Sequence, residues 1–252
     1  MISETPMEPN DTTRQDPLLE KARAYRVRLA DDSENGSLWI EYGDFVQKNF
    51  EMPDEVVRAY AKAAELLPNQ DLRLRLGDAY VRAGKQEEGL SLIQESLAEN
   101  PRSHGFCFLA AAYLRLGNYA SAEHAAEEAV RYDPDFEEAY YLLGEATRKR
   151  SRKVAIACYR AAIERDAQYA LAWQALGREL AAADSTLDEA IVALRTAIDL
   201  NPEDGWAMVF LANALWRTDH SEEADLWYRR AIDAFPEYEE MKKWYAQFLR
   251  SD

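Results

Sequence analysis

This chain of 252 residues has few histidines and cysteines and no long apolar run. Its three histidines form no HExxH or other metal-ligand spacing, so the sequence predicts no metal site. No apolar run approaches the ~20 residues that span a bilayer. Residues 1–16 hold neither a basic start nor an apolar stretch, so we expect no secretory signal and no lipid anchor.

Positive charge is also scarce. The chain has 30 Lys and Arg residues against 46 Asp and Glu, which gives a net charge of −16. A nucleic-acid-binding protein needs a cationic surface to displace counterions, so we expect no nucleic-acid partner. A basic protein partner would fit this charge, although the simpler interpretation is that acidity keeps the protein dispersed.

The groups that catalysis requires are missing as well. The sequence contains no glycine-rich phosphate loop. Acidic pairs such as Glu127-Glu128 and Glu222-Glu223 are adjacent in sequence, so their side chains point in different directions on a helix. We therefore predict no catalytic residues and no cofactor.

What the chain does have is a regular spacing of prolines. Six positions follow one another at intervals of 33, 33, 33, 35 and 34 residues: Pro68, Pro101, Pro134, Ala167 in a proline's place, Pro202 and Pro236. A fixed period in this range is typical of a solenoid, a stack of similar supersecondary units. Solenoids bind other molecules along extended surfaces more often than they catalyse reactions.

The residues between the prolines repeat too. The best-preserved unit reads Trp173, Leu176-Gly177, Leu180, Ala190, Leu194, Ala197 and Pro202. This pattern resembles the tetratricopeptide repeat, a helix-turn-helix of 34 residues. We number repeat positions so that Trp is 4, Leu-Gly is 7 and 8, Tyr is 11 and Pro is 32. Positions 4, 7, 8 and 11 form one apolar stripe on the first helix, and small residues at 8, 20 and 27 let helices approach closely.

The resemblance implies an all-α, right-handed superhelical solenoid of six repeats over residues 36–236. We expect a disordered acidic tail at 1–16, an N-terminal helix within 17–35 and a C-terminal capping helix within 237–252. Cys107 and Cys158 fall in different repeats, too far apart for a disulfide. Free thiols point to a reducing compartment, so we expect a cytoplasmic protein.

One segment departs from the acidic character of the chain. Residues 148–153 carry five positive charges at the inter-helix turn of the fourth repeat. Cations suit the C-terminal end of a helix, and a solvated turn explains the cluster. The alternative is an electrostatic dock, formed by Arg150, Arg152 and Lys153, for an acidic segment of a partner or for the protein's own acidic tail.

In this family the first helices line a concave groove, and ligands meet positions 2, 5, 6, 9, 12 and 13. In the third to sixth repeats these positions mix apolar and polar side chains, which is typical of partner-binding sites. Tyr141, Trp206 and Trp216 favour binding, because amphipathic aromatics suit interfaces. Leu142, Leu171 and Phe210 are at least as well explained by packing between helices. The candidate partner-binding residues are His104, Phe108, Tyr141, Glu145, Arg148, Gln174, Arg178, Trp206, Val209, Asn213 and Trp216.

The first repeat differs from those of chaperone-docking relatives, which clamp a C-terminal carboxylate with Lys and Asn. Ile40 and Asp44 stand where those residues would be expected. We predict a non-catalytic protein-interaction protein, acting as a scaffold, adaptor or dedicated chaperone. It would bind a peptide or helix of a partner, with a basic or apolar segment, in its groove. The alternative is a structural scaffold whose repeats form homo-oligomers.

Overall fold

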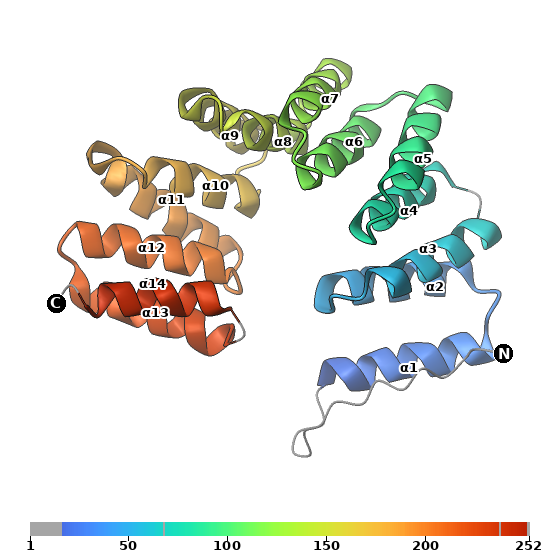
Figure 1. Cartoon of the computed structure of the whole chain (residues 1–252), viewed down its shortest axis with the longest axis horizontal. Helices are drawn as coiled ribbons and strands as arrows, with labels where there is room; N and C mark the ends of the chain where they lie inside the picture. The colour runs from blue at the N-terminus through green and yellow to red at the C-terminus, as the bar shows by residue number, and fades with distance from the viewer. Residues whose placement is uncertain (1–16, 68, 237, 251–252) are drawn as a thin grey trace. The chain divides into compact units, whose positions relative to one another are not determined.

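The structure, a computed structural model, describes residues 17–67, 69–236 and 238–250, and the expected tail at 1–16 lies outside them. The described residues form helices and no strands, so the predicted all-α fold is confirmed (Figure 1). In chain order the helices are α1 (Pro17–Asp31), α2 (Gly36–Asn49), α3 (Pro53–Leu66), α4 (Gln70–Arg82), α5 (Gln86–Glu99), α6 (Ser103–Arg115), α7 (Tyr119–Tyr132), α8 (Glu137–Thr147), α9 (Arg152–Arg165), α10 (Ala170–Leu180), the 3-10 turn η1 (Asp184–Thr186), α11 (Leu187–Leu200), α12 (Gly205–Arg217), α13 (Ser221–Ala234) and α14 (Glu239–Phe248).

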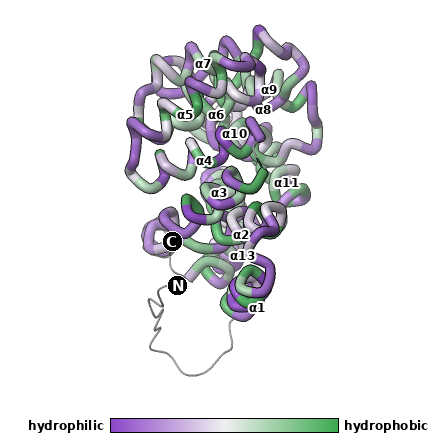
Figure 2. The backbone as a smooth tube through the Cα atoms, turned by 90° about the vertical axis from the view of Figure 1, so that its right-hand side faces the viewer, coloured by the Kyte–Doolittle hydropathy of each residue, from purple (hydrophilic) through white to green (hydrophobic). Residues whose placement is uncertain are grey.

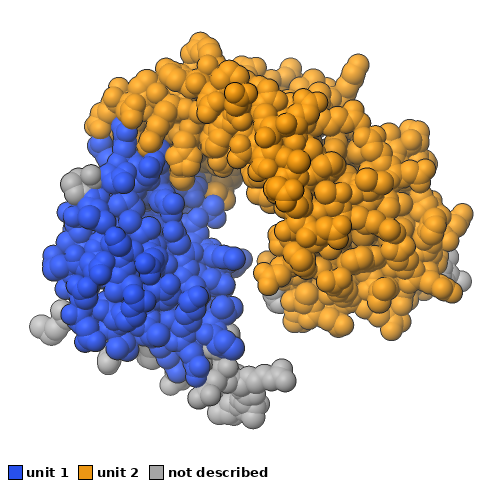
Figure 3. Space-filling model, turned by 180° about the vertical axis from the view of Figure 1, so that it is seen from behind, with its two compact units in different colours: residues 1–92 blue, residues 93–252 orange. Residues whose placement is uncertain are grey.

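The chain divides into two compact units, residues 1–92 and 93–252, and the division falls within α5 (Figure 3). Unit 1 contains α1 to α4 and the start of α5, and unit 2 contains the helices that follow. Two helices make each repeat. The pairs are α2 with α3, α4 with α5, α6 with α7, α8 with α9, α10 with α11, and α12 with α13.

In unit 1 the buried tyrosine Tyr42 joins three helices. It is 2% exposed, and its hydroxyl donates to Glu55 of α3 at 2.5 Å while accepting from the Arg26 Nε of α1 at 2.8 Å. Burial, followed by the Glu55 carboxylate, raises the pKa of Tyr42 to about 12, so this phenol remains a donor at neutral pH. A hydrogen-bonded hydroxyl lets a large ring occupy the core without an unpaired polar group.

The turn within a repeat uses a left-handed backbone at position 15 in three repeats. Gly84 has φ of 79° and Gly117 has φ of 72°, and the equivalent residue of the sixth repeat, Asp219, has φ of 59°. Glycine adopts this conformation without a steric penalty, and aspartate is among the few other residues that tolerate it. After the turn, the second helix of the third repeat starts at Asn118, whose side chain accepts from the Ser121 amide.

The first helices of unit 2 are buried on two sides. On α12, positions 7 and 11 face the core with Leu211 and Leu215, at 0% and 1% exposure. Positions 3 and 10, Ala207 and Ala214, are both 0% exposed. The reason is that α12 packs on α11 of the preceding repeat as well as on α13 of its own. Accordingly, Figure 2 shows hydropathy alternating along the helices instead of forming separate apolar blocks.

Glycine at position 8 reflects close helix approach. A Cβ placed on Gly144 of α8 would lie 2.4 Å from the Cε1 atom of Tyr159, the buried tyrosine of α9. Real Cβ contacts essentially never come this close, so the glycine is what allows a full tyrosine ring to lie flat against α8. This packing also places the Tyr159 hydroxyl, described below, at the edge of the core.

Cys107 and Cys158 are both free and both buried. Burial, with the Glu123 carboxylate adding to it, raises the pKa of the Cys158 thiol to about 11. Burial raises the pKa of Cys107 as well. Both residues therefore stay as neutral thiols at physiological pH and serve as small core side chains.

Candidate functional site

All eleven candidate partner-binding residues lie on, or at the end of, the four first helices of unit 2: α6, α8, α10 and α12. We call the surface made by positions 2, 5, 6, 9, 12 and 13 of these helices the inner face. The structure shows how accessible the candidates are. His104 is exposed, and its ring contacts Phe108 edge-on with a centroid distance of 5.0 Å. Of the two, His104 is exposed and Phe108 is partly buried.

Val209 is not available. It is 0% exposed and belongs to the core formed by α11 to α14, so its assignment as a partner contact was wrong. The physical reason is that position 5 of α12 lies next to the buried positions of the same helix, and the neighbouring helices cover it. Position 5 is also buried in α6, where Cys107 is 2% exposed.

Tyr141 lies deeper than an open interface residue would. Its ring meets the Tyr169 ring edge-on at 5.6 Å and lies 6.2 Å from the ring of Tyr159. Burial, and then the Glu145 carboxylate, raises the pKa of Tyr141 to about 12. The ring thus contributes to packing between α8, α9 and the start of α10, and its role as a partner contact stays a prediction.

This burial predicts a pH effect on stability. The unfolded chain releases a tyrosine proton near pH ~10. Between there and about pH 12 the native state binds more protons than the unfolded state, so the free energy of unfolding falls as pH rises. The Tyr141→Phe variant cannot lose this proton, and its stability should fall less steeply. Urea unfolding at about pH 9 and about pH 11 measures the difference. Tyr132→Phe, at a ring 46% exposed, is the control, and parallel curves for all three proteins would contradict the expectation.

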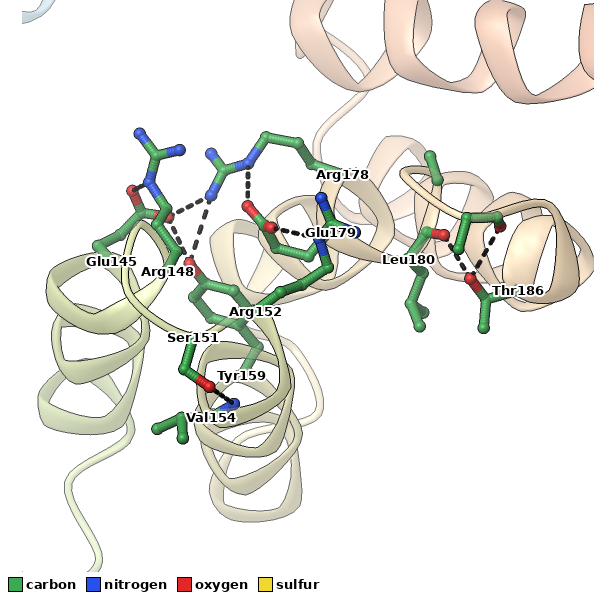
Figure 4. A network of polar contacts seen from close by, with 12 residues as sticks. Glu145, Arg148, Ser151, Arg152, Val154, Tyr159, Arg178, Glu179, Leu180 and Thr186 are labelled. Atoms are coloured by element: carbon green, nitrogen blue, oxygen red, sulfur yellow. Dashed lines mark hydrogen bonds and ion pairs between the residues drawn. The ribbon is translucent and has the colours of Figure 1, made fainter.

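The polar candidates Glu145, Arg148 and Arg178 belong to one network, shown in Figure 4. The Glu145 carboxylate accepts from Arg178 Nη2 at 2.6 Å and pairs with Arg148 Nε at 3.1 Å. Arg178 Nε donates to Glu179 at 3.2 Å, and Arg152 Nε lies 3.6 Å from the same carboxylate. Guanidinium and carboxylate groups therefore alternate in the order Arg148, Glu145, Arg178, Glu179, Arg152, which we call the arginine–glutamate chain.

Tyr159 supports the arginine–glutamate chain from the core. Its ring is 0% exposed, and its hydroxyl donates to Glu145 at 2.8 Å and accepts from Arg178 Nη2 at 3.3 Å. Burial and the nearby Glu145 carboxylate both raise the pKa of Tyr159, so the phenol stays neutral and keeps donating. A similar arrangement occurs in unit 1, where Asp44 accepts from the Tyr60 hydroxyl at 2.5 Å and from Arg75 Nη1 at 2.6 Å.

Most cations of the basic turn at 148–153 already have partners within the protein. Arg150 pairs with Glu123, and Arg152 pairs with Glu179 as described. The Lys149 ammonium lies 4.2 Å from the centroid of the Tyr119 ring, a cation–π contact. Lys153 is exposed and has no ion-pair partner among the residues described. Of the predicted dock, Lys153 alone is unpaired within the described part of the chain, and the dock stays a prediction.

The C-terminal end of unit 2 carries an aromatic surface that joins α12 to α14. The Trp206 ring lies 6.3 Å from Tyr238 and 6.1 Å from Phe210, and Phe210 lies 5.9 Å from Trp244. We call these four residues the aromatic row. Tyr238 is 42% exposed and Trp244 is 36% exposed, while Trp206 and Phe210 are partly buried between them. Trp216, further along α12, packs edge-on against Phe248 at 5.8 Å.

Two members of the aromatic row, Tyr238 and Trp244, were missed by sequence reasoning. They lie in and next to the helix expected to be a cap, beyond the six repeats that end at Pro236. A signal was present: numbering from Pro236 places Trp244 at position 6, the same inner-face position as Phe210.

The polar candidates Gln174 and Asn213 also lie on the inner face. Gln174 donates to Asp204, the N-cap residue of α12, at 3.0 Å.

Over the residues that the structure describes, no cluster of three or more His, Cys, Asp or Glu side chains is arranged to hold a metal ion. Within the same residues, no helix is long and apolar enough to cross a membrane.

Comparison with known sequence families identifies the repeats. Residues 109–154 and 181–248 each match a family described as tetratricopeptide repeat. Together with the helix pairs, these matches show that the chain is a tetratricopeptide repeat protein. No curated protein matches the sequence.

Solved structures with the same fold differ widely in sequence. The chain resembles one in the APC/C heterotetramer Cut9–Hcn1, with a TM-score of 0.72 at 17% identity over 91% of this chain and 46% of that one. The structure of yeast Tom70 matches with a TM-score of 0.65 and 16% sequence identity, and the match covers 92% of this chain and 58% of Tom70. TTC0263, a tetratricopeptide repeat protein of Thermus thermophilus, matches with a TM-score of 0.60 and 23% sequence identity. This match covers 72% of this chain and 99% of TTC0263. The chain thus spans about half the length of the first two, and at these identities the likeness concerns the fold.

Proposed function

We propose that this protein is a non-catalytic protein-interaction module, and that unit 2 binds a peptide or helix of a partner protein on its inner face. The fold supports this, since stacked repeats present extended surfaces for binding. The similar structure of Cut9–Hcn1 is a complex of two different proteins, which is consistent with the same use of the fold. We place the protein in the cytoplasm as part of this proposal, because both of its thiols are free.

The observation that carries the proposal is the aromatic row. Four aromatic side chains, from α12, from α14 and from the residue before α14, form a continuous series of ring contacts, and two of them are more than a third exposed. Aromatic residues are enriched at interface hot spots because they bury a large area with little loss of side-chain entropy. Leu171, exposed at 45% on α10, adds an apolar side chain on the preceding first helix. An apolar segment of a partner is the chemistry that this surface suits.

Acidic residues border the aromatic row. Glu203 and Asp204 precede α12, and Glu239 and Glu240 lie in the first turn of α14. They suit the helix N-termini, and because Glu239 is paired with Lys242 at 2.7 Å, Glu203, Asp204 and Glu240 supply the negative charge beside the aromatic row. A partner segment with apolar residues flanked by Lys or Arg would therefore complement both the row and its rim.

Replacing Trp244 with alanine tests the proposal. Truncating an aromatic hot-spot residue typically costs ~2 kcal/mol or more, roughly thirtyfold in affinity. Partners captured from a native lysate by the wild type should thus be depleted from the Trp244→Ala sample when both are quantified by mass spectrometry. Thermal melting of the same variant checks that it remains folded, because the indole is only 36% exposed and also packs on Phe210.

Leu226→Ala is the matched control, because Leu226 lies 62% exposed on the second helix α13. It should capture the same partners as the wild type. Equal recovery by Trp244→Ala would contradict binding at the aromatic row. The competing hypothesis, self-assembly, predicts a mass that rises with concentration in light scattering, and a constant monomer mass would exclude it.

A further inference from the structure

The arginine–glutamate chain holds more positive than negative charge and leaves donors unused. A guanidinium group has five N–H donors. Ion pairs engage Nε of Arg148 and Nε of Arg152, and hydrogen bonds engage Nε and Nη2 of Arg178. The remaining Nη groups have no partner among the residues described, and Figure 4 shows those of Arg148 and Arg178 directed away from Glu145.

These guanidinium groups are more exposed to solvent than their internal counterions. The side chains of Arg148 and Arg178 are 34% and 23% exposed. Glu145 and Glu179 are 16% and 12% exposed and lie beneath them. The surface presented to a partner is therefore cationic, even though carboxylates are close by.

The local charge is unusual for this protein. The arginine–glutamate chain contains three arginines and two glutamates, an excess of one positive charge, within a molecule of net charge −16. Lys149 and Lys153 are exposed in the adjacent basic turn (148–153) and add to the positive potential. An anion that approached this acidic protein would find its favourable region here.

The arginine side chains are already held by contacts within the protein. Glu145 binds both Arg148 and Arg178, and the Tyr159 hydroxyl holds Glu145 from the core. The donors are thus positioned by ion pairs within the protein. Binding an anion then requires little ordering of long arginine side chains, which is a main cost of such contacts.

We propose that Arg148 and Arg178 form a receptor for one aspartate or glutamate side chain of the partner segment, with Glu145 and Tyr159 as positioning residues. This rests on the proposed function and adds the chemistry of one contact to it. Guanidinium groups bind carboxylates through paired N–H donors. A single carboxylate matches the excess of one charge, whereas the two internal glutamates would repel a doubly charged phosphate more strongly.

A fluorescein-labelled hexaglutamate peptide, followed by anisotropy at low salt, tests the receptor on the full-length protein. Arg148→Gln should weaken binding about tenfold, and added salt should weaken binding to the wild type. Glu145→Gln should strengthen binding, because it removes the internal competitor for both guanidinium groups. Arg160→Gln and Glu189→Gln make the same charge changes at an exposed pair between α9 and α11, and should leave affinity within about twofold.

Three results would overturn the receptor: no binding of hexaglutamate, equal loss for Arg148→Gln and Arg160→Gln, or tighter binding of an oligonucleotide of equal charge. The last two would show only general attraction of polyanions. Because the Arg148 side chain is partly exposed, we expect the Arg148→Gln variant to fold, and thermal melting checks this. The proposed function is tested separately by Trp244→Ala. If partner capture depends on Trp244 but hexaglutamate does not bind, the receptor is rejected and the proposed function stands.

Discussion

Replacing Leu211 with alanine should lower the free energy of unfolding by about 2–5 kcal/mol, the range measured for buried leucines. Leu211 occupies position 7 of α12, is 0% exposed and lies in the core that joins α11 to α14. Because α12 has neighbours on both sides, the cavity would disrupt two helix interfaces at once. Urea denaturation followed by circular dichroism measures the change.

Leu226→Ala provides the control for this prediction, because it removes the same atoms from a side chain that is 62% exposed. Surface substitutions of this kind usually stay within about 0.5 kcal/mol. Similar losses for the two variants would mean that burial on α12 does not determine stability, and would contradict the packing described here.

The second large effect is expected at the Arg178–Glu145 pair. A double-mutant cycle with Arg178→Met and Glu145→Gln should give a coupling energy of about 1–3 kcal/mol, below the figure for fully buried pairs because some solvent reaches this one. The two side chains are 23% and 16% exposed. Arg178→Met alone removes a positive charge that pairs with both Glu145 and Glu179, so it should be the more destabilising of the two single substitutions. Thermal and urea unfolding of the four proteins supply the cycle.

The same cycle at Arg160 and Glu189 is the comparison. Both side chains are about half exposed, at 50% and 49%, and the pair joins α9 to α11. Exposed pairs typically contribute ~0.2–1 kcal/mol, so the coupling should lie at the low end of that range. Equal couplings at the two pairs would show that the arginine–glutamate chain is no more than a set of surface ion pairs.

Some of the site could be predicted from the sequence. Repeat numbering placed Glu145, Arg148 and Arg178 on the same face, and the structure brings these three side chains into one network. That they bind one another was not predictable, because the pairing depends on the separation of α8 and α10 across α9. The misassignment of Val209 has a related cause. Helical periodicity defines a face, but which part of that face a neighbouring helix covers depends on the packing of successive repeats.

The sequence by itself determined the helix-pair architecture of this protein. Prolines and small residues at a period near 34 set the start, the turn and the close approaches of each pair, and these are local properties of the chain. Tertiary structure alone decided which inner-face side chains remain accessible. Positions 3 and 10 of α12 are buried because this helix lies between two second helices, and Trp244 lies beside Phe210 because α14 packs against α12 and α13. The Phe210–Trp244 contact joins residues 34 positions apart, so no local pattern contains it.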